Sequence, residues 1–120
     1  MTGKERHEAD EGRRAQLLKG LGELALLKLL GDGPCYGLQI LERLRAEAGI
    51  DLAEGTIYPL LHRLEKAGLT KAEWRLEDEG ARPRKYYALT DAGRADLMVQ
   101  LDSWRRISST LGAFLERTNP

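Results

Sequence analysis

Few residues in this sequence have side chains suited to catalysis or to covalent cross-linking. Its 120 residues include one cysteine, Cys35, and two histidines, His7 and His62. One cysteine cannot close an intrachain disulfide, and no familiar metal-ligand or nucleophile spacing such as Cys-x-x-Cys or His-Glu-x-x-His occurs. We therefore expect no enzymatic activity, no metal and no cofactor. Cys35 is expected to be an inert small residue, with a redox-sensing thiol as the alternative.

Long apolar runs and an excess of one charge are also missing. The longest apolar runs are four residues, such as 24–27, whereas a membrane-spanning helix needs about 20. Residues 1–14 are charged throughout and lack the apolar segment of a secretory signal. These features predict a cytoplasmic protein with no membrane partner. Basic and acidic residues each number 19, which excludes a wholly basic nucleic-acid coat but not a local basic patch.

The N-terminal third of the chain divides into a charged segment and a leucine-rich helix. Residues 1–14 carry four basic and four acidic side chains, which predicts a flexible charged tail, with a frayed helical extension as the alternative. Leucines at spacings of one, three and four predict a first helix over 15–30, ended by the glycines at 31 and 33. Its apolar stripe is wider than a monomer needs. The stripe is either central to the core or partly covered by a second chain.

Two shorter helices are expected next. The second begins at Pro34 and ends at Gly49, with Leu38, Ile40, Leu41 and Leu44 facing inward. The third lies within 52–67 and buries Ile57, Leu60, Leu61 and Leu64. Its start stays open between a capping box of Asp51 with Glu54 and a cap at Thr56. Pro59 favours the later start, or a mild kink in the longer helix.

The apolar period then changes from 3.6 to 2. Residues 70–76 alternate as a half-buried strand, with Trp74 expected in the core, and 84–89 return as a second strand after a loop at 78–83. Thr90 is expected to cap a last helix over 91–117. This order predicts a mainly α protein with a small β-hairpin. It is the plan of a winged helix-turn-helix domain (15–90) followed by a long last helix (91–117).

The third helix has the outward residues that a DNA-reading helix needs, namely donors, an aromatic ring and positive charge. Segment 56–75 has four basic residues against two acidic ones, whereas 32–55 has two against five. The free N–H groups at the start of the helix also suit a phosphate, to which the hydroxyl of Thr56 would add. The candidate DNA contacts on this helix are Thr56, Tyr58, Pro59, His62, Arg63 and Lys66.

Three cations at the expected hairpin suit phosphate contact or minor-groove insertion. They are Arg82, Arg84 and Lys85, beside the stiffening Pro83. Asp78 and Glu79 on the other limb reduce the local positive charge.

The run from Glu54 to Leu69 (EGTIYPLLHRLEKAGL), Trp74, and the run from Arg84 to Arg94 (RKYYALTDAGR) resemble the PadR family of transcriptional regulators. Residues 36–40 (YGLQI) resemble the second helix of that family, and the resemblance covers about 17–115. It implies a homodimeric repressor with the third helix in the major groove of a pseudo-palindromic operator in double-stranded DNA. The resemblance adds Tyr36 to the DNA contacts and again includes Arg84 and Lys85.

The resemblance also implies that the last helix mediates dimerisation, with help from the first. The residues expected at the dimer interface are Leu17, Leu21, Leu24, Leu97, Leu101, Trp104, Ile107, Leu111 and Phe114. Some short family members stack planar aromatic ligands between tryptophans of the two last helices, and Trp104 matches that position. Simple packing of Trp104 in the dimer core is the alternative, slightly favoured.

Two functions of different classes therefore remain. The favoured one is a DNA-binding repressor released by a small molecule or another signal. The alternative is a winged-helix module for protein or ligand binding without DNA, consistent with the zero net charge. The salt dependence of binding distinguishes them, because phosphate contacts release counterions.

Overall fold

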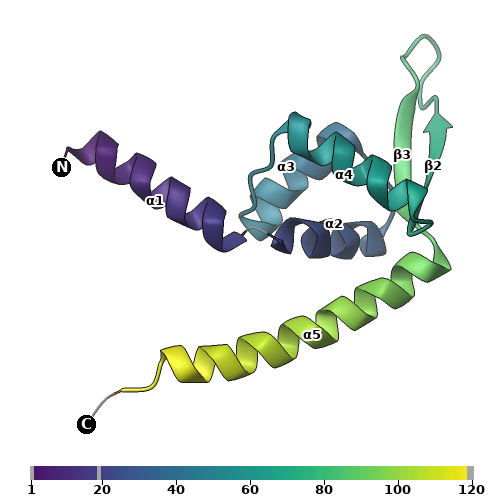
Figure 1. The fold of residues 1–120 in the computed structure, drawn as a ribbon. Helices are drawn as coiled ribbons and strands as arrows, with labels where there is room; N and C mark the ends of the chain where they lie inside the picture. Colours follow the sequence, from purple (N-terminus) through teal and green to yellow (C-terminus); the bar gives the residue numbers. More distant parts are fainter. Residues whose placement is uncertain (1, 19, 119–120) are drawn as a thin grey trace.

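The computed structural model describes residues 2–18 and 20–118. Three helices pack together, a β-hairpin projects from one end of them, and two further helices extend away (Figure 1). This is the predicted winged helix-turn-helix arrangement, mainly α with a small sheet. In chain order the elements are α1 (Gly3–Leu18), α2 (Leu21–Asp32), β1 (Cys35–Tyr36), α3 (Gly37–Ala48), α4 (Glu54–Lys66), β2 (Thr70–Arg75), β3 (Arg84–Leu89) and α5 (Asp91–Leu115).

The prediction of one first helix over 15–30 is wrong, because two helices meet near Gly20. The φ of Gly20 is 90°, a left-handed conformation that ends a helix and that glycine adopts without a steric penalty. Helix α1 starts with a capping box, in which the N–H of Glu5 donates to Thr2 Oγ1 and the N–H of Thr2 donates to Glu5 Oε2. The expected boundary between residues 14 and 15 therefore falls inside α1.

The helix predicted to begin at Pro34 is α3, and it begins three residues later, at Gly37. Cys35 and Tyr36 instead form the short strand β1, which pairs antiparallel with β3 through Tyr87 and Tyr86. The predicted end at Gly49 is confirmed, with a φ of 67°. Leu38 was expected to face inward but is 51% exposed, because it lies in the first turn of α3, at the edge of the domain.

Helix α4 lies within the predicted range, although neither predicted cap is used. It starts at Glu54 after Ala53, which has no side-chain cap bond, and Pro59 lies inside the helix. The N–H groups of Thr56 and Ile57 both donate to the Ala53 carbonyl. The helix therefore begins without any side-chain acceptor, and Pro59 is accommodated in its interior.

The two long strands form the predicted hairpin, and the strand order in the sheet is β1-β3-β2. The prediction that Trp74 lies in the core is wrong, because its side chain is 67% exposed. The predicted alternation of inward and outward residues along β2 is confirmed at the start of the strand, because Thr70 is buried and Ala72 is half-buried on the same face. The hairpin, however, extends beyond the helices (Figure 1), so this face has no core to pack against at Trp74.

The hydrophobic core joins all three central helices to the base of the hairpin. Cys35 belongs to it, with an exposed fraction of 1%, and its Sγ accepts a hydrogen bond from Arg43 Nη1 at 3.5 Å. Leu97, expected at a dimer interface, is buried within the same core. The helical residues with essentially no exposed surface are Leu26, Leu27, Leu30, Ile40, Ile57, Leu61 and Leu64.

One junction fixes the base of the hairpin, the end of α4 and the start of α5. The N–H of Thr90 donates to the Leu69 carbonyl (3.1 Å), and its hydroxyl donates to the Gly68 carbonyl (2.6 Å). The same hydroxyl oxygen accepts from the N–H of Gly93 (3.0 Å), which confirms Thr90 as the cap of α5. A Cβ atom on Gly93 would lie 2.0 Å from the Leu69 carbonyl oxygen. Only glycine fits at this position.

Gly93→Ala is therefore expected to lower the free energy of unfolding by about 2 kcal/mol or more, because a backbone carbonyl must move. Gly112→Ala in the same helix is the matched control, since a Cβ atom added there would have no neighbouring atom within 4 Å. The control should change stability by less than about 1 kcal/mol. Urea unfolding at a fixed protein concentration measures both variants, and equal stabilities would contradict the tight junction.

Candidate nucleic-acid interface

The exposed face of α4 is the centre of the candidate interface. Ile57, Leu61 and Leu64 are buried, and each residue advances about 100° around a helix. The opposite face is therefore centred on Gly55, Pro59, His62 and Lys66. All six residues predicted to point outward on this helix are exposed, as expected: Thr56, Tyr58, Pro59, His62, Arg63 and Lys66.

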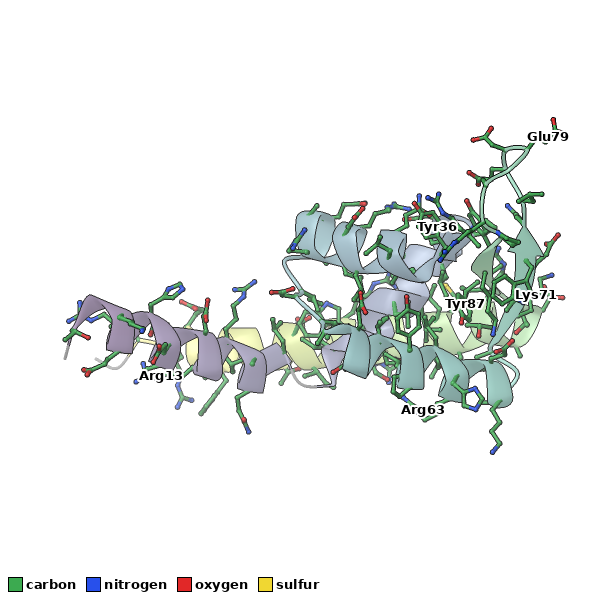
Figure 2. The ribbon with its side chains drawn as sticks, turned by 90° about the horizontal axis from the view of Figure 1, so that it is seen from above. Arg13, Tyr36, Arg63, Lys71, Glu79 and Tyr87 are labelled. Atoms are coloured by element: carbon green, nitrogen blue, oxygen red, sulfur yellow. The ribbon has the colours of Figure 1, made fainter. Side chains whose placement is uncertain are left out.

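Arg63 lies at one edge of that face and is paired with a carboxylate of α2. Its Nη2 is 2.6 Å from Glu23 Oε1. The other oxygen of Glu23 accepts a hydrogen bond from Gln100 of α5 (3.2 Å), and Gln100 also donates to Asp96. Figure 2 shows Arg63 on the opposite side of the domain from Tyr36 and the hairpin tip at Glu79. The best guanine-binding candidate in the sequence is thus already hydrogen-bonded within the protein.

Tyr58 lies at the other edge of α4, against the first residue of α3. A Cβ atom on Gly37 would lie 2.7 Å from both Cε1 and the hydroxyl of Tyr58. The ring therefore rests directly on the Gly37 backbone, and it stays 45% exposed. The sequence pair Tyr36-Gly37 positions this aromatic side chain beside the hairpin.

The three cations of the hairpin differ in the groups that they contact. The Arg84 guanidinium lies 4.5 Å from the centre of the Tyr36 ring, a cation–π contact. Lys85 Nζ is 3.5 Å from Glu65 Oε1 of α4, a partly exposed and therefore weak ion pair. Arg82 lies in the exposed loop between the strands, and no carboxylate of the described residues lies within 4 Å of Arg82 or Arg84.

Two of the four acidic residues of the hairpin, Glu73 and Glu77, lie on the face of the sheet that carries Tyr86. The hydroxyl of Tyr86 donates to the Glu77 carboxylate, which raises the pKa of Tyr86, and burial adds to this increase. Glu73 pairs with Arg75 across 3.7 Å. Tyr86 and Glu73 face each other across the two strands, one residue away from the Lys85–Trp74 pair. Because strand neighbours alternate in direction, these carboxylates point away from the α4 side of the sheet. Arg84 leaves the sheet on this far face too, as the strand partner of Arg75, and reaches the edge of the sheet beside Tyr36.

The wing cleft, as we name it, is a hollow of about 480 Å³ between α4, the start of α3 and the hairpin. Tyr58 forms one wall and Trp74 the other, with Arg84 and Lys85 beside them. No acidic residue of the described chain lines it. Its lining residues are Tyr36, Gly37, Leu38, Tyr58, Trp74, Arg84, Lys85 and Tyr87.

Helix α5 exposes an apolar stripe beyond its packing on α2. Trp104 is 43% exposed and lines a second hollow of about 340 Å³ with Leu21, Leu24 and Leu101. Leu17 of α1 is 80% exposed. The other strongly exposed apolar residues of α5 are Met98, Val99, Ile107, Leu111, Phe114 and Leu115.

Two other kinds of site are not found among the described residues. They contain no group of three or more side chains placed to hold a metal ion. In the same residues, no helix is both long and apolar enough to cross a membrane. Recognition helix, cation-bearing wing and capped last helix together define the class of winged-helix transcriptional regulators.

The chain belongs to the PadR-like family of transcriptional regulators, whose model matches residues 26–99. A PadR family regulator from Eggerthella lenta is 31% identical, covers 97% of this chain and 100% of its own, and superposes with a TM-score of 0.80. A PadR-like regulator from Bacillus cereus is also 31% identical, covers 86% and 99%, and gives 0.77. The transcriptional regulator Rv3488 of Mycobacterium tuberculosis is 39% identical over 74 residues, 62% of this chain and 66% of its own. DNA-binding transcriptional regulation follows from this membership.

The sequence does not predict that four further residues belong to this surface. Glu23 and Glu65 pair with cations that are distant in sequence, and nothing local indicates such pairs. Trp74 and Leu38 were assigned to the interior. For Trp74 a signal existed: its strand partner is Lys85, and a lysine on the inward face indicates that the core has already ended there.

Gly37→Ala is expected to move the Tyr58 ring away from α3, because the new Cβ atom would overlap the end of that ring. The unfolding free energy should fall by less than about 1 kcal/mol, since a side-chain end can rotate away more easily than backbone. Crystal structures of this variant and of Gly55→Ala, where nothing lies within 4 Å, provide the measurement. A Tyr58 ring unmoved by Gly37→Ala would contradict the contact.

Proposed function

We propose that this protein is a homodimeric repressor that binds a pseudo-palindromic operator and is released by a small molecule or another signal. Helix α4 enters the major groove, and the hairpin contacts the adjacent backbone or minor groove. The two α4 helices of the dimer lie about 34 Å apart, one turn of DNA. The proposed DNA contacts are Tyr36, Thr56, Tyr58, Pro59, His62, Arg63, Lys66, Arg82, Arg84 and Lys85.

The observation that carries the proposal is the exposed face of α4 beside a cation-bearing wing. His62 and Lys66 lie at the centre of that face and are exposed. Neither is paired with a carboxylate among the described residues, whereas Arg63 must leave Glu23 before it can reach a base. We therefore propose that His62 and Lys66 make the first contacts with DNA. Arg63 then contacts a base only in the complex with the specific DNA sequence.

The test is binding of the purified protein to the DNA directly upstream of its own gene. A scrambled duplex of equal length is compared at several salt concentrations. A repressor of its own gene binds the native duplex more tightly, with a steep decrease in affinity as salt rises. Weak binding that ignores salt and sequence would favour the alternative, a winged-helix module for protein or ligand binding.

Lys66→Ala should weaken binding several-fold on both duplexes and reduce the salt slope by about one, as expected for a lost phosphate contact. Lys28→Ala is the matched control, because Lys28 is an exposed lysine of α2 paired with Asp32 and lies outside the proposed face. Fluorescence anisotropy of end-labelled DNA measures both variants. Equal losses in the two variants would remove Lys66 from the interface.

The dimer is supported by the uncovered apolar stripe of α5. Ile107 and Phe114 are each 58% exposed, and exposed apolar patches of this kind mark interaction sites. Together with Leu17, Leu21, Leu24, Leu101, Trp104 and Leu111, these side chains would pack against the same residues of a second copy. We place Leu97 in the core of its own protomer rather than at this interface.

Ile107→Asp combined with Phe114→Asp is expected to give a protein of 13.4 kDa in sedimentation, where the unchanged protein gives twice that mass. Burying two carboxylates in an apolar interface is strongly unfavourable. Ser109→Asp on the opposite face of α5 is the control and should remain dimeric. A double variant that also remains dimeric would place the interface elsewhere.

Trp104 is assigned to the dimer core, with a planar aromatic effector as a second candidate role. The hollow of about 340 Å³ beside Trp104 favours that second role, because its size is within the range of small-molecule sites. Effector binding there would bias the spacing of the two α4 helices and so release the operator.

A further inference from the structure

The wing cleft contains two large apolar side chains that the fold leaves exposed. Trp74 is 67% exposed and Leu38 is 51% exposed. A tryptophan is among the most costly residues to leave in water. In the cleft it faces Tyr58, with Arg84 and Lys85 alongside. The cleft thus combines apolar walls with positive charge.

The direction in which Trp74 points follows from the strand pairing. Trp74 is directly opposite Lys85 in the β2–β3 register, so the two side chains leave the sheet on the same face. Lys85 reaches Glu65 of α4, and that face is therefore turned toward the recognition helix. Trp74 and Tyr58 consequently form opposite walls of one hollow.

The position of the cleft indicates which ligand would lie in it. In B-form DNA each sugar–phosphate strand forms the ridge between a major and a minor groove. When α4 lies in the major groove and the hairpin contacts the neighbouring minor groove, one strand must pass between them. The wing cleft lies between α4 and the hairpin. A DNA strand also alternates an anionic phosphate with the largely apolar face of deoxyribose, which matches two cations and two aromatic walls.

We infer that one sugar–phosphate strand of bound DNA occupies the wing cleft, with Trp74 packed against deoxyribose and Arg84 and Lys85 on the flanking phosphates. This inference rests on the proposed function and adds Trp74 and Leu38 to the DNA-contacting residues. The ion pair of Lys85 with Glu65 is partly exposed and 3.5 Å long, so a phosphate can replace the carboxylate at little cost. Arg84 keeps its contact with the Tyr36 ring while its guanidinium donates to phosphate.

The two tryptophans of the chain, Trp74 and Trp104, allow a direct test. The unchanged protein carries both indole fluorophores, and the Trp74→Phe protein retains Trp104 alone. Each is titrated with the DNA upstream of its own gene and with a scrambled duplex, while anisotropy of a label on the DNA end reports binding independently. The difference between the two emission changes at saturating DNA is the Trp74 emission. It is expected to change in step with the anisotropy, and the Trp74→Phe protein should bind with a much smaller emission change.

Affinity supplies the second readout. Trp74→Ala is expected to weaken binding of the upstream DNA about tenfold, the equivalent of about 1.4 kcal/mol. Leu76→Ala is the matched control, since Leu76 is an exposed apolar residue two positions along, 58% exposed, and does not line the cleft. It should change affinity less than about twofold. Circular dichroism checks that both variants fold.

Each outcome has a distinct meaning. Rising anisotropy without any change in Trp74 emission, or equal affinities of the Trp74→Ala and Leu76→Ala proteins, would overturn the inference and leave the repressor intact. No rise in anisotropy on either duplex at low salt would overturn the proposed function and the inference together. Parallel changes in both signals with a selective loss for Trp74→Ala would establish the strand in the cleft.

Discussion

The arrangement of the candidate nucleic-acid interface depends on one hydrogen-bonded junction. Thr90 joins the end of α4, the base of the hairpin and the first turn of α5 through bonds to Gly68, Leu69 and Gly93. The contact is so close that Gly93 has no room for a Cβ atom. Because the recognition helix and the wing meet here, their relative angle is set by backbone groups and by one short side chain, that of Thr90. The long helix that carries the exposed apolar stripe starts at the same junction.

Although the net charge of the chain is zero, its acidic and basic side chains are distributed unevenly over the candidate interface. Acidic residues are paired at the edges of the interface, with Glu23 on Arg63 and Glu65 on Lys85. The centre of the α4 face and the wing cleft contain only neutral and basic side chains among the described residues. Both ion pairs are partly exposed and therefore weak. The local charge of the interface is thus positive at its centre and close to neutral at its edges.

Periodicity in the sequence predicts the class of fold, the hairpin, the cap at Thr90 and the exposed face of α4, because each depends on residues close together along the chain. The break at Gly20 was missed since leucines continue on both sides of it and hide the change of direction. Strand β1 was missed because two residues carry no periodicity, and only pairing with Tyr86 and Tyr87 makes them a strand. The prediction that Trp74 is buried was wrong for a different reason. Alternation shows which face of the strand a residue occupies, but not how far the core extends along the strand.

The contact between Gly37 and Tyr58 also limits how this surface can change during evolution. The two residues lie on different helices, yet the ring of one occupies the space that a side chain on the other would need. A lineage that first loses the tyrosine frees position 37 to vary. A lineage that first gains a side chain at position 37 displaces the ring and reshapes this wall of the wing cleft at once. The order of substitutions therefore decides which shapes of the cleft are reachable, and the two positions should change together among descendants of this chain.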